Sequence, residues 1–343
     1  SNQLWGTNAV PSESAERKYG NGLIVWGGAT TKSASTDKLY PSYESTVAFL
    51  QKQGVRPVFH STGNLRYICR QTKERDIFFV GNREATAQRV TATFRTDGCL
   101  PELWNPTDGS HRVLPDGHVY EGVVAIPITL EPYESGFVVF SRNVQDKRTK
   151  ATGHSVVACN FSDLKPLQAL QGPWEVTFDP TWGGPKSPVT FQKLSDWTTH
   201  ADPAIKFYSG IATYRITFNA PPQLSNRFYL SLGALHKIAQ IKLNGETLGI
   251  VWTPPYRLEV TGKLRPTGNV LEVDVANTWV NRLIGDQQPG DKGVRNLKWE
   301  TGLLGGKSYP AGRYTFSTVN NYTAKSPLQE SGMIGPVTIM VSE

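Results

Sequence analysis

The feature that most constrains this chain is the alternation of apolar and polar residues in several short segments. From Leu271 to Val275, three aliphatic residues alternate with Glu272 and Asp274. A period of two places the aliphatic side chains on one face of a β-strand and the carboxylates on the other. The same alternation recurs at residues 174–178, 214–218, 228–232 and 337–341. Each strand therefore has one face for a core, and the pattern predicts antiparallel sheets in a β-sandwich or jelly roll.

Turn residues mark where strands connect. Asn244-Gly245 lies between two runs of strand-forming residues, and both residue types accept the positive φ angles of a two-residue type I′ turn. We therefore expect the flanking strands to form a hairpin. Nearer the N-terminus we predict strands at residues 76–80, 90–95, 119–130 and 137–140. The Asp-Gly pairs at residues 97–98, 108–109 and 116–117 separate them, which favours a second antiparallel β-domain.

The first 60 residues differ from the rest. Residues 23–26 predict a short buried strand, and Tyr43, Val47 and Leu50 fall at helical spacing in a helix predicted over residues 42–53. These elements cannot enclose a core alone, so they either dock on the next domain or are the remnant of a cut one, which we favour. We predict the tail of an α/β domain at residues 1–60, an antiparallel β-sandwich at 61–150 and a jelly roll at 151–343.

Charge and hydropathy exclude two classes of partner. The 36 basic and 29 acidic residues give a net charge of +7, and this mild excess is spread along the chain. The densest basic stretch, residues 146–150, is interpreted as a solvated linker, so we expect no nucleic-acid partner. No run of about 18 apolar residues occurs, so we predict no membrane span. The chain starts at Ser1 without methionine, and we expect a fragment of a longer protein.

The titratable residues show no familiar catalytic or metal motif. Cys69, Cys99 and Cys159 cannot all pair and have no zinc-binding spacing, so we interpret them as buried thiols, with one disulfide left open if the protein is exported. His111 and His118 flank an Asp-Gly turn and could meet Asp108 or Asp116, but two loop histidines beside acids are commonplace. We therefore predict no metal site from these residues.

Glycoside hydrolysis usually needs two carboxylates held on a rigid scaffold beside the sugar. Glu102 and Glu134 lie next to aromatic residues and are the acids to consider, but we interpret each as a loop carboxylate. The chain contains no nucleophile elbow, phosphate-binding loop or His-Glu-x-x-His motif. We predict no catalytic residue.

Two segments, residues 252–257 and 277–286, contain side chains suited to binding carbohydrate. An aromatic ring can cover the apolar face of a sugar, while amide, guanidinium and carboxylate groups bond its hydroxyls in pairs. We expect the two segments to lie near each other, and the alternative is that these side chains plug the core, contact another domain or form a structural ion pair. The predicted carbohydrate-binding residues are Trp252, Tyr256, Arg257, Asn277, Trp279, Asn281, Arg282 and Asp286.

Longer motifs resemble known glycosidases. The Asn-Gly hairpin, the segment 254–257, and the strand that ends at Asn277-Thr278-Trp279 resemble the jelly-roll sugar-binding domain of family 2 glycosidases, which is galactose-binding-like. The motifs at residues 172–174, 182–185, 208–210, 281–286 and 331–336 resemble the C-terminal region of bacterial α-L-rhamnosidases of glycoside hydrolase family 106. Weaker similarity to the same enzymes extends upstream to residues 19–22, 76–82, 101–104 and 137–140.

The resemblance implies a mainly β protein of two antiparallel β-sandwiches with a short α/β remnant. In that family the acid and base glutamates and a calcium site lie in a barrel that would precede Ser1, so no catalytic position carries over. The family often has histidine where this chain has Cys69 before Arg70. This departure puts in doubt whether the surface next to the barrel functions here as it does in the family.

The implied function is a non-catalytic scaffold with a carbohydrate contact, in a periplasmic or secreted bacterial enzyme. Its partners would be the missing barrel and a rhamnose-containing polysaccharide. The resemblance implies no cofactor, and a structural calcium ion in the jelly roll stays open, as in many relatives of that fold. The alternative function is a free-standing lectin-like module that binds plant or bacterial polysaccharide.

Overall fold

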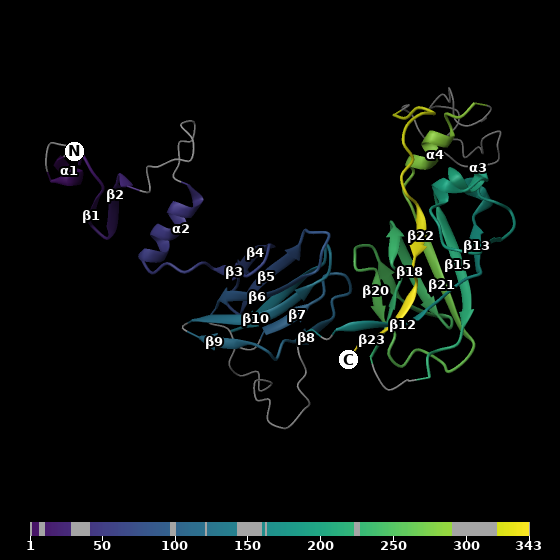
Figure 1. Cartoon of the computed structure of the whole chain (residues 1–343), viewed down its shortest axis with the longest axis horizontal. Coiled ribbons are helices and arrows are strands. Elements are labelled where there is room, and N and C mark those ends of the chain that lie inside the picture. The colour runs from purple at the N-terminus through teal and green to yellow at the C-terminus, as the bar shows by residue number, and fades with distance from the viewer. Residues whose placement is uncertain are drawn as a thin grey trace.

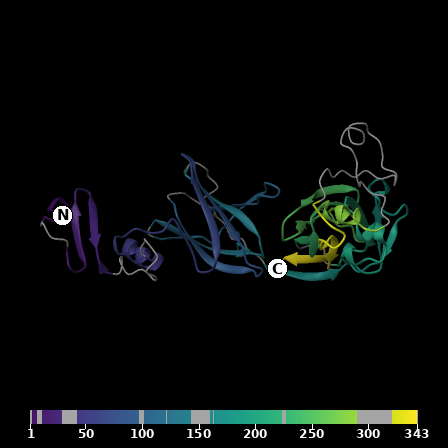
Figure 2. The ribbon, with the colours of Figure 1, turned by 90° about the horizontal axis from the view of Figure 1, so that it is seen from above.

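The computed structural model describes residues 2–6, 11–28, 42–96, 101–120, 122–142, 160–161, 163–222, 227–289 and 321–342. Two antiparallel β-sandwiches follow a short N-terminal part along the chain. Both views place the N-terminal hairpin and its helix at one end, the first sandwich in the middle and the second at the other end (Figures 1 and 2). The predicted fold class, mainly β with two antiparallel sandwiches, is confirmed.

The N-terminal part is a hairpin and one longer helix. Its elements are α1 (Asn2–Trp5), β1 (Ala15–Tyr19), β2 (Gly22–Trp26) and α2 (Tyr43–Lys52). The predicted helix is confirmed, and Ser42 caps it by accepting a 3.1 Å hydrogen bond from the amide of Ser45. The strand expected at residues 23–26 is confirmed as β2, but the expectation that it is buried is wrong. Trp26 is 45% exposed because β2 pairs only with β1, although its ring meets that of Trp5 edge to face at 6.4 Å.

The first sandwich packs a four-stranded sheet against a five-stranded sheet, in the orders β3-β6-β10-β9 and β4-β5-β11-β7-β8. The four strands are β3 (Phe59–Ser61), β6 (Gln88–Arg95), β9 (His118–Tyr120) and β10 (Val123–Leu130). The five are β4 (Leu65–Gln71), β5 (Arg75–Asn82), β7 (Pro101–Trp104), β8 (His111–Val113) and β11 (Ser135–Ser141). Phe78, Phe94 and Phe140 meet in the core with ring centroids 4.9–5.8 Å apart.

One expectation for this sandwich needs correction. The segment predicted as a single strand over residues 119–130 contains two strands, β9 and β10, which pair with each other. Asp116-Gly117 separates two strands as predicted, and it leads from β8 in one sheet to β9 in the other. Asp116 is fixed there by Asn160, since each side chain accepts a 2.9 Å hydrogen bond from the other residue's amide. The pair at 108–109 does turn β7 into β8 as predicted, and the pair at 97–98 lies outside the described residues.

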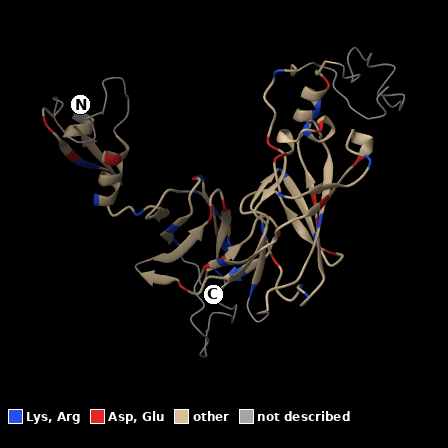
Figure 3. Ribbon diagram, turned by 45° about the vertical axis from the view of Figure 1, so that its right-hand side comes forward, with Lys and Arg blue, Asp and Glu red and all other residues tan. Residues whose placement is uncertain are grey.

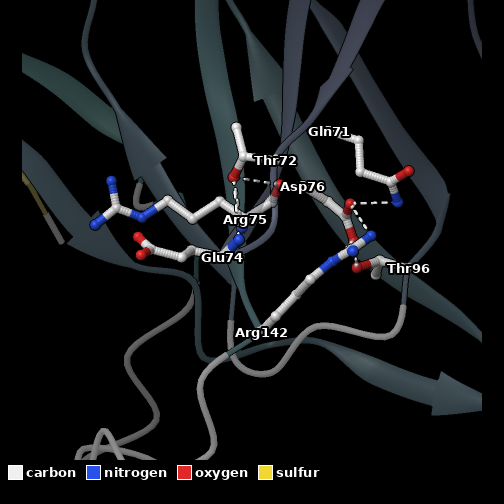
Figure 4. Close-up of polar contacts among 7 residues, drawn as sticks. All are labelled: Gln71, Thr72, Glu74, Arg75, Asp76, Thr96 and Arg142. Carbon is white, nitrogen blue, oxygen red and sulfur yellow. Dashed lines mark hydrogen bonds and ion pairs between the residues drawn. The ribbon is translucent and has the colours of Figure 1, made fainter.

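The buried carboxylate of Asp76 accepts hydrogen bonds from side chains at the ends of three other strands in this sandwich. The side chain of Asp76 on β5 is 3% exposed and accepts hydrogen bonds from Thr96 (2.7 Å), Gln71 (2.9 Å) and Arg142 Nη2 (2.6 Å), as Figure 4 shows. Burial raises its pKa and is the largest single effect. The hydrogen bonds from Thr96, Arg142 and Gln71 and the charge of Arg142 together outweigh it, so the pKa of Asp76 lies below its ordinary value of 3.8.

We expect Asp76→Asn to lower the free energy of unfolding by about 1.5–3 kcal/mol at neutral pH, because it removes the charged acceptor that Thr96, Gln71 and the partly exposed Arg142 share. The folded pKa of Asp76 is depressed, so its contribution is present above pH 3.8 and is lost as pH falls through the folded pKa. The difference between the variant and the wild type should therefore shrink in acid. Urea denaturation at neutral and acid pH measures it.

Asp163→Asn is the matched control, because its ion pair with Arg89 (2.7 Å) is exposed on both sides and should contribute little. Equal losses for the two variants would contradict the role of Asp76.

The second sandwich is the larger one. Its main sheets run β12-β23-β16-β20 and β14-β13-β15-β21-β18-β19, and a two-stranded sheet pairs β17 with β22. The six-stranded sheet contains β13 (Trp174–Phe178), β14 (Val189–Phe191), β15 (Ile211–Phe218), β18 (Ile238–Leu243), β19 (Glu246–Val251) and β21 (Asn269–Ala276). The others are β12 (Leu164–Ala169), β16 (Phe228–Ser231), β17 (Ala234–His236), β20 (Arg257–Glu259), β22 (Gly332–Gly335) and β23 (Thr338–Ser342).

The alternation found in the sequence is what packs this sandwich. Leu271, Val273 and Val275 of β21 are fully buried, while the residues between them are only partly buried. Short helical segments close the ends of the sheets. These are η3 (Pro180–Trp182), η4 (Trp197–Thr199), α3 (Pro203–Lys206) and α4 (Val280–Gly285).

Buried tryptophan and tyrosine link the core to the C-terminal strands. The indole of Trp197 donates a 2.6 Å hydrogen bond to the hydroxyl of Tyr214, which also accepts from the amide of Met333. A Cβ at Gly332 would lie 2.4 Å from the Trp197 ring, so only glycine fits beside it. Burial raises the pKa of Tyr214. These contacts explain why the glycine-rich segment at residues 332–335 lies directly against the core.

The predicted Asn244-Gly245 hairpin is confirmed. Leu243 pairs with Glu246, and the two turn residues have φ angles of 56° and 86°. The Asn244 side chain also accepts a hydrogen bond of 3.0 Å from the amide of Val270, which ties the turn to β21.

Gly245→Val should lower the free energy of unfolding by about 1–2 kcal/mol, because a β-branched residue is strained at positive φ. No atom lies within 4 Å of a Cβ placed there, so the cost is conformational rather than steric. Gly245→Asn should cost less, since asparagine tolerates this conformation. Equilibrium unfolding of both variants tests this order, and an equal loss would contradict it.

Candidate carbohydrate-binding surface

The two predicted binding segments leave the six-stranded sheet at the same end. Ala239 of β18 pairs with Val251, the last residue of β19, and Ile238 pairs with Ala276, the last residue of β21. The segments that begin at Trp252 and Asn277 therefore start on either side of β18. The register brings the two segments together, as the sequence predicted.

Two of the predicted residues present aromatic rings at the surface. Trp252 follows β19 and is 55% exposed, and Trp279 precedes α4 and is 38% exposed. The ring of Trp279 meets that of Trp182 edge to face at 5.3 Å. Tyr256 is partly buried against the core, and burial raises the pKa of its hydroxyl. Trp252 is therefore the most accessible ring for a sugar face.

Arg257 on β20 lies between the two sandwiches. Its Nη1 is 3.9 Å from Oε1 of Glu131, in the turn after β10, and its guanidinium carbon is 5.8 Å from the centre of the Tyr229 ring. Glu134 in the same turn accepts a 2.7 Å hydrogen bond from the Glu131 amide. Burial raises the pKa of Glu134, although the charge of Arg257 opposes this. Glu131 was not singled out from the sequence, because its partner is 126 positions away and no local pattern announces it.

The amide side chains of the second segment are engaged within the protein. Asn277 donates to the carbonyl of Tyr208 (2.9 Å) and to the hydroxyl of Ser331 (3.1 Å), and its oxygen accepts from the amide of Gly210. Asn281 donates to the carbonyl of Gln329 (2.7 Å) and accepts from the amide of the same residue (2.8 Å). Asn277, directly after β21, and Asn281, in α4, therefore both bind the segment before β22.

Arg282 and Asp286 form a buried ion pair one helical turn apart in α4. Nε of Arg282 donates to Oδ1 of Asp286 at 3.0 Å, and the two side chains are 4% and 6% exposed. The geometry directs both charges at each other rather than at a surface ligand. Of the eight predicted residues, Trp252 and Trp279 are the exposed ones, and the sugar-binding role of the whole set stays a prediction.

The other polar candidates lie apart from this surface. The carboxylate of Glu102 accepts a 2.9 Å hydrogen bond from the indole of Trp104, and His111 and His118 belong to different sheets. Among the described residues no group of three or more His, Cys, Asp and Glu is arranged to hold a metal ion. Cys69 is a free thiol whose pKa is raised by burial, and Cys99 and Cys159 lie outside the described residues.

The charges are interspersed over both sandwiches, as Figure 3 shows. The basic stretch at residues 146–150 lies outside the described ranges. Within the part of the chain that the structure describes, no helix has the length and the hydropathy that crossing a bilayer requires.

Comparison with known proteins agrees with this architecture. Residues 3–115 match a family described as alpha-L-rhamnosidase, and residues 189–309 match one described as glycosyl hydrolase 2 galactose-binding domain-like. The rhamnosidase from Novosphingobium sp. PP1Y superposes with a TM-score of 0.74 at 28% identity, covering 99% of this chain and 28% of that one. A protein of Formosa agariphila provisionally named beta-glucuronidase is 37% identical over 261 residues, which are 74% of this chain and 22% of the relative.

These findings define the class. The chain is glycoside hydrolase-like, is similar to rhamnosidase and glucuronidase relatives, and contains a galactose-binding-like domain. The resemblance to family 106 α-L-rhamnosidases and to the family 2 sugar-binding jelly roll, inferred from the motifs, is confirmed. The chain spans less than a third of the length of either relative.

Asn281→Ala should lower the free energy of unfolding by about 1–3 kcal/mol, because Asn281 is buried and its loss removes the hydrogen bonds to the backbone of Gln329 and to the buried hydroxyl of Ser331. Trp252→Ala, at an exposed position, should stay within about 0.5 kcal/mol of the wild type. Chemical denaturation of both variants provides the test. A large loss for Trp252→Ala would mean that this ring has a structural role.

Proposed function

We propose that this chain is the non-catalytic C-terminal part of an α-L-rhamnosidase-like glycoside hydrolase that acts on rhamnose-containing plant or bacterial polysaccharide. Its own role is to support the catalytic part and to contact carbohydrate. The parent protein is proposed to be bacterial and periplasmic or secreted. The main support is the match of nearly the whole chain to 28% of a rhamnosidase.

The proposal assigns hydrolysis to the part of the parent protein outside this chain. Hydrolysis with retention or inversion needs two carboxylates facing one sugar. Glu102 and Glu134, the acids singled out from the sequence, lie on β7 and in the turn after β10, and each is hydrogen-bonded to a neighbouring protein group.

The exposed indole of Trp252 supports the carbohydrate contact. A half-exposed tryptophan at the end of a rigid sheet offers a flat apolar surface at a fixed position. Trp279 lies on the second segment at the same sheet end. The same observation supports the alternative function, a free-standing lectin-like module.

One measurement separates the two functions. The intact mass of the protein purified from its native gene should lie far above 37.9 kDa, and that product should hydrolyse an aryl α-L-rhamnoside while this chain alone should not. A native product near 37.9 kDa without turnover would refute the enzyme part and favour the lectin.

The carbohydrate contact is tested separately on this chain. A glycan array should show binding to rhamnose-containing oligosaccharides that Trp252→Ala reduces at least several-fold. Trp252→Phe, which keeps a ring, should retain part of the binding. Binding that is unchanged in Trp252→Ala would contradict the proposed contact.

A further inference from the structure

Two central strands of the first sandwich are apolar on both faces. Residues 77–80 of β5 and 137–140 of β11 are uninterrupted runs of Ile, Val and Phe. Phe78, Val80, Val138 and Phe140 belong to the core between the sheets, so the alternate residues lie on the outer face. Antiparallel strands with one solvated face normally alternate apolar with polar residues. These strands have instead the composition of a sheet covered on both sides.

The register assembles the outer residues into one row across all five strands. Ile68 pairs with Phe79, Phe79 with Phe137, Phe137 with Trp104, and Trp104 with His111. The rings of Phe79 and Phe137 are 5.0 Å apart, and those of Trp104 and His111 are 5.5 Å apart. We call these five residues the outer row. Ile68, at one end, is 55% exposed.

A parallel row beside it is also largely apolar. It contains Arg70, Ile77, Val139, Glu102 and Val113, which are again successive partners across the five strands. Val113, at the edge of the sheet, is 38% exposed, whereas Val139 on the central strand is 3% exposed and is already covered within this chain.

The face has a basic border. Arg66 and Arg75 lie on the same side of the sheet as the outer row and are exposed. The guanidinium of Arg75 lies 5.2 Å from the centre of the Trp104 ring. With Arg70 on β4, the two rows and their border contain three arginines and one carboxylate, Glu102 on β7. The face therefore combines an apolar centre with a positively charged edge.

The second sandwich supplies an internal comparison. The outer face of its six-stranded sheet is mostly polar, as in the row of Arg215, Glu272 and Lys242 and in the bond of Lys242 to Asp274 (2.9 Å). Its exposed apolar residues are few: Ile211 and Ile238 flank Ala276 at one end, and Ile250 lies opposite Gln240. Two sandwiches of one chain therefore differ in whether the outer face is suited to water.

We propose that the outer row is the surface on which the remainder of the parent polypeptide docks. This inference rests on the proposed function, and it names the contact by which this chain supports the catalytic part. The matched regions make up only 22% and 28% of the two relatives, so in such proteins most of the polypeptide lies outside this region. The docking surface on that polypeptide is apolar at its centre and acidic at its border, to match the three arginines.

The residue types favour a protein over a sugar. Isoleucine, valine and phenylalanine predominate on this face, and they offer no hydrogen-bonding group for hydroxyls. Trp104, the residue best suited to a sugar, has the Arg75 guanidinium near its ring and its indole N–H bonded to Glu102. Apolar side chains aligned on a flat sheet are instead typical of contacts that exclude water.

Hydroxyl-radical footprinting of this chain and of the full product of its native gene tests the docking. Labelling of Ile68, Phe79 and Phe137 should fall several-fold in the full product, whereas that of Ile211 should change little. Labelling that stays equal in the two proteins would overturn the inference. Protection of the face in this chain by added rhamnose-containing oligosaccharide would also overturn it, in favour of a glycan site.

A pair of matched variants gives a second readout. Ile68→Glu should lower the Tm of the full product but leave that of this chain unchanged. Ile211→Glu should leave both unchanged, and it is a close control because Ile211 is 57% exposed on the outer face of the other sandwich. Equal effects of the two variants in the full product would contradict the docking.

The outcomes separate this inference from the proposed function. A full product that hydrolyses the rhamnoside but leaves the outer row accessible would overturn the inference alone. A native product no larger than this chain would contradict both the docking inference and the proposed function.

Discussion

The second sandwich depends on the pairing of β21 with β15 on one side and β18 on the other. All eight residues of β21 are paired with β15, and the alternate aliphatic side chains are fully buried between the sheets. Because side chains alternate with a period of two, a slip of one residue would turn Leu271, Val273 and Val275 to solvent and bury Glu272 and Asp274. This register also fixes where β19 and β21 end, and so it positions Trp252 and Asn277 at one end of the sheet.

Polar groups join segments that are distant in sequence once the sheets have formed. Asp76 gathers Gln71, Thr96 and Arg142 at the end of the first sandwich, and Ser331 receives hydrogen bonds from Asn277 and Asn281 at the end of the second. The members of these two networks are hydrogen-bonded to one another, which is the condition under which such groups can be buried at modest cost. Substitutions that remove one member leave the others unsatisfied, so we regard these networks as more sensitive than the exposed ion pairs.

The two sandwiches use their outer faces differently. The polar outer face of the six-stranded sheet is suited to water, whereas β5 and β11 carry phenylalanine, isoleucine and valine on both faces. The hairpin strand β2 and the helix α2, which buries no residue, lead to the same conclusion, since both leave large apolar side chains exposed. A polypeptide outside this chain that covers these surfaces would account for both observations, and this agrees with the short share of each relative that the chain spans.

The sequence by itself determined the local structure: the alternating strands, the Asn244-Gly245 turn and the helix at residues 43–52 follow from side-chain period and backbone preference. Family motifs added the class of protein. Only the tertiary structure decided which polar residues are buried, because burial depends on strands that pair across long separations. Arg282 and Asp286 resembled sugar ligands in the sequence but form a buried ion pair, while Trp252 is exposed. The outer row is likewise invisible in any single segment, since its five residues come from five strands and only the pairing register aligns them.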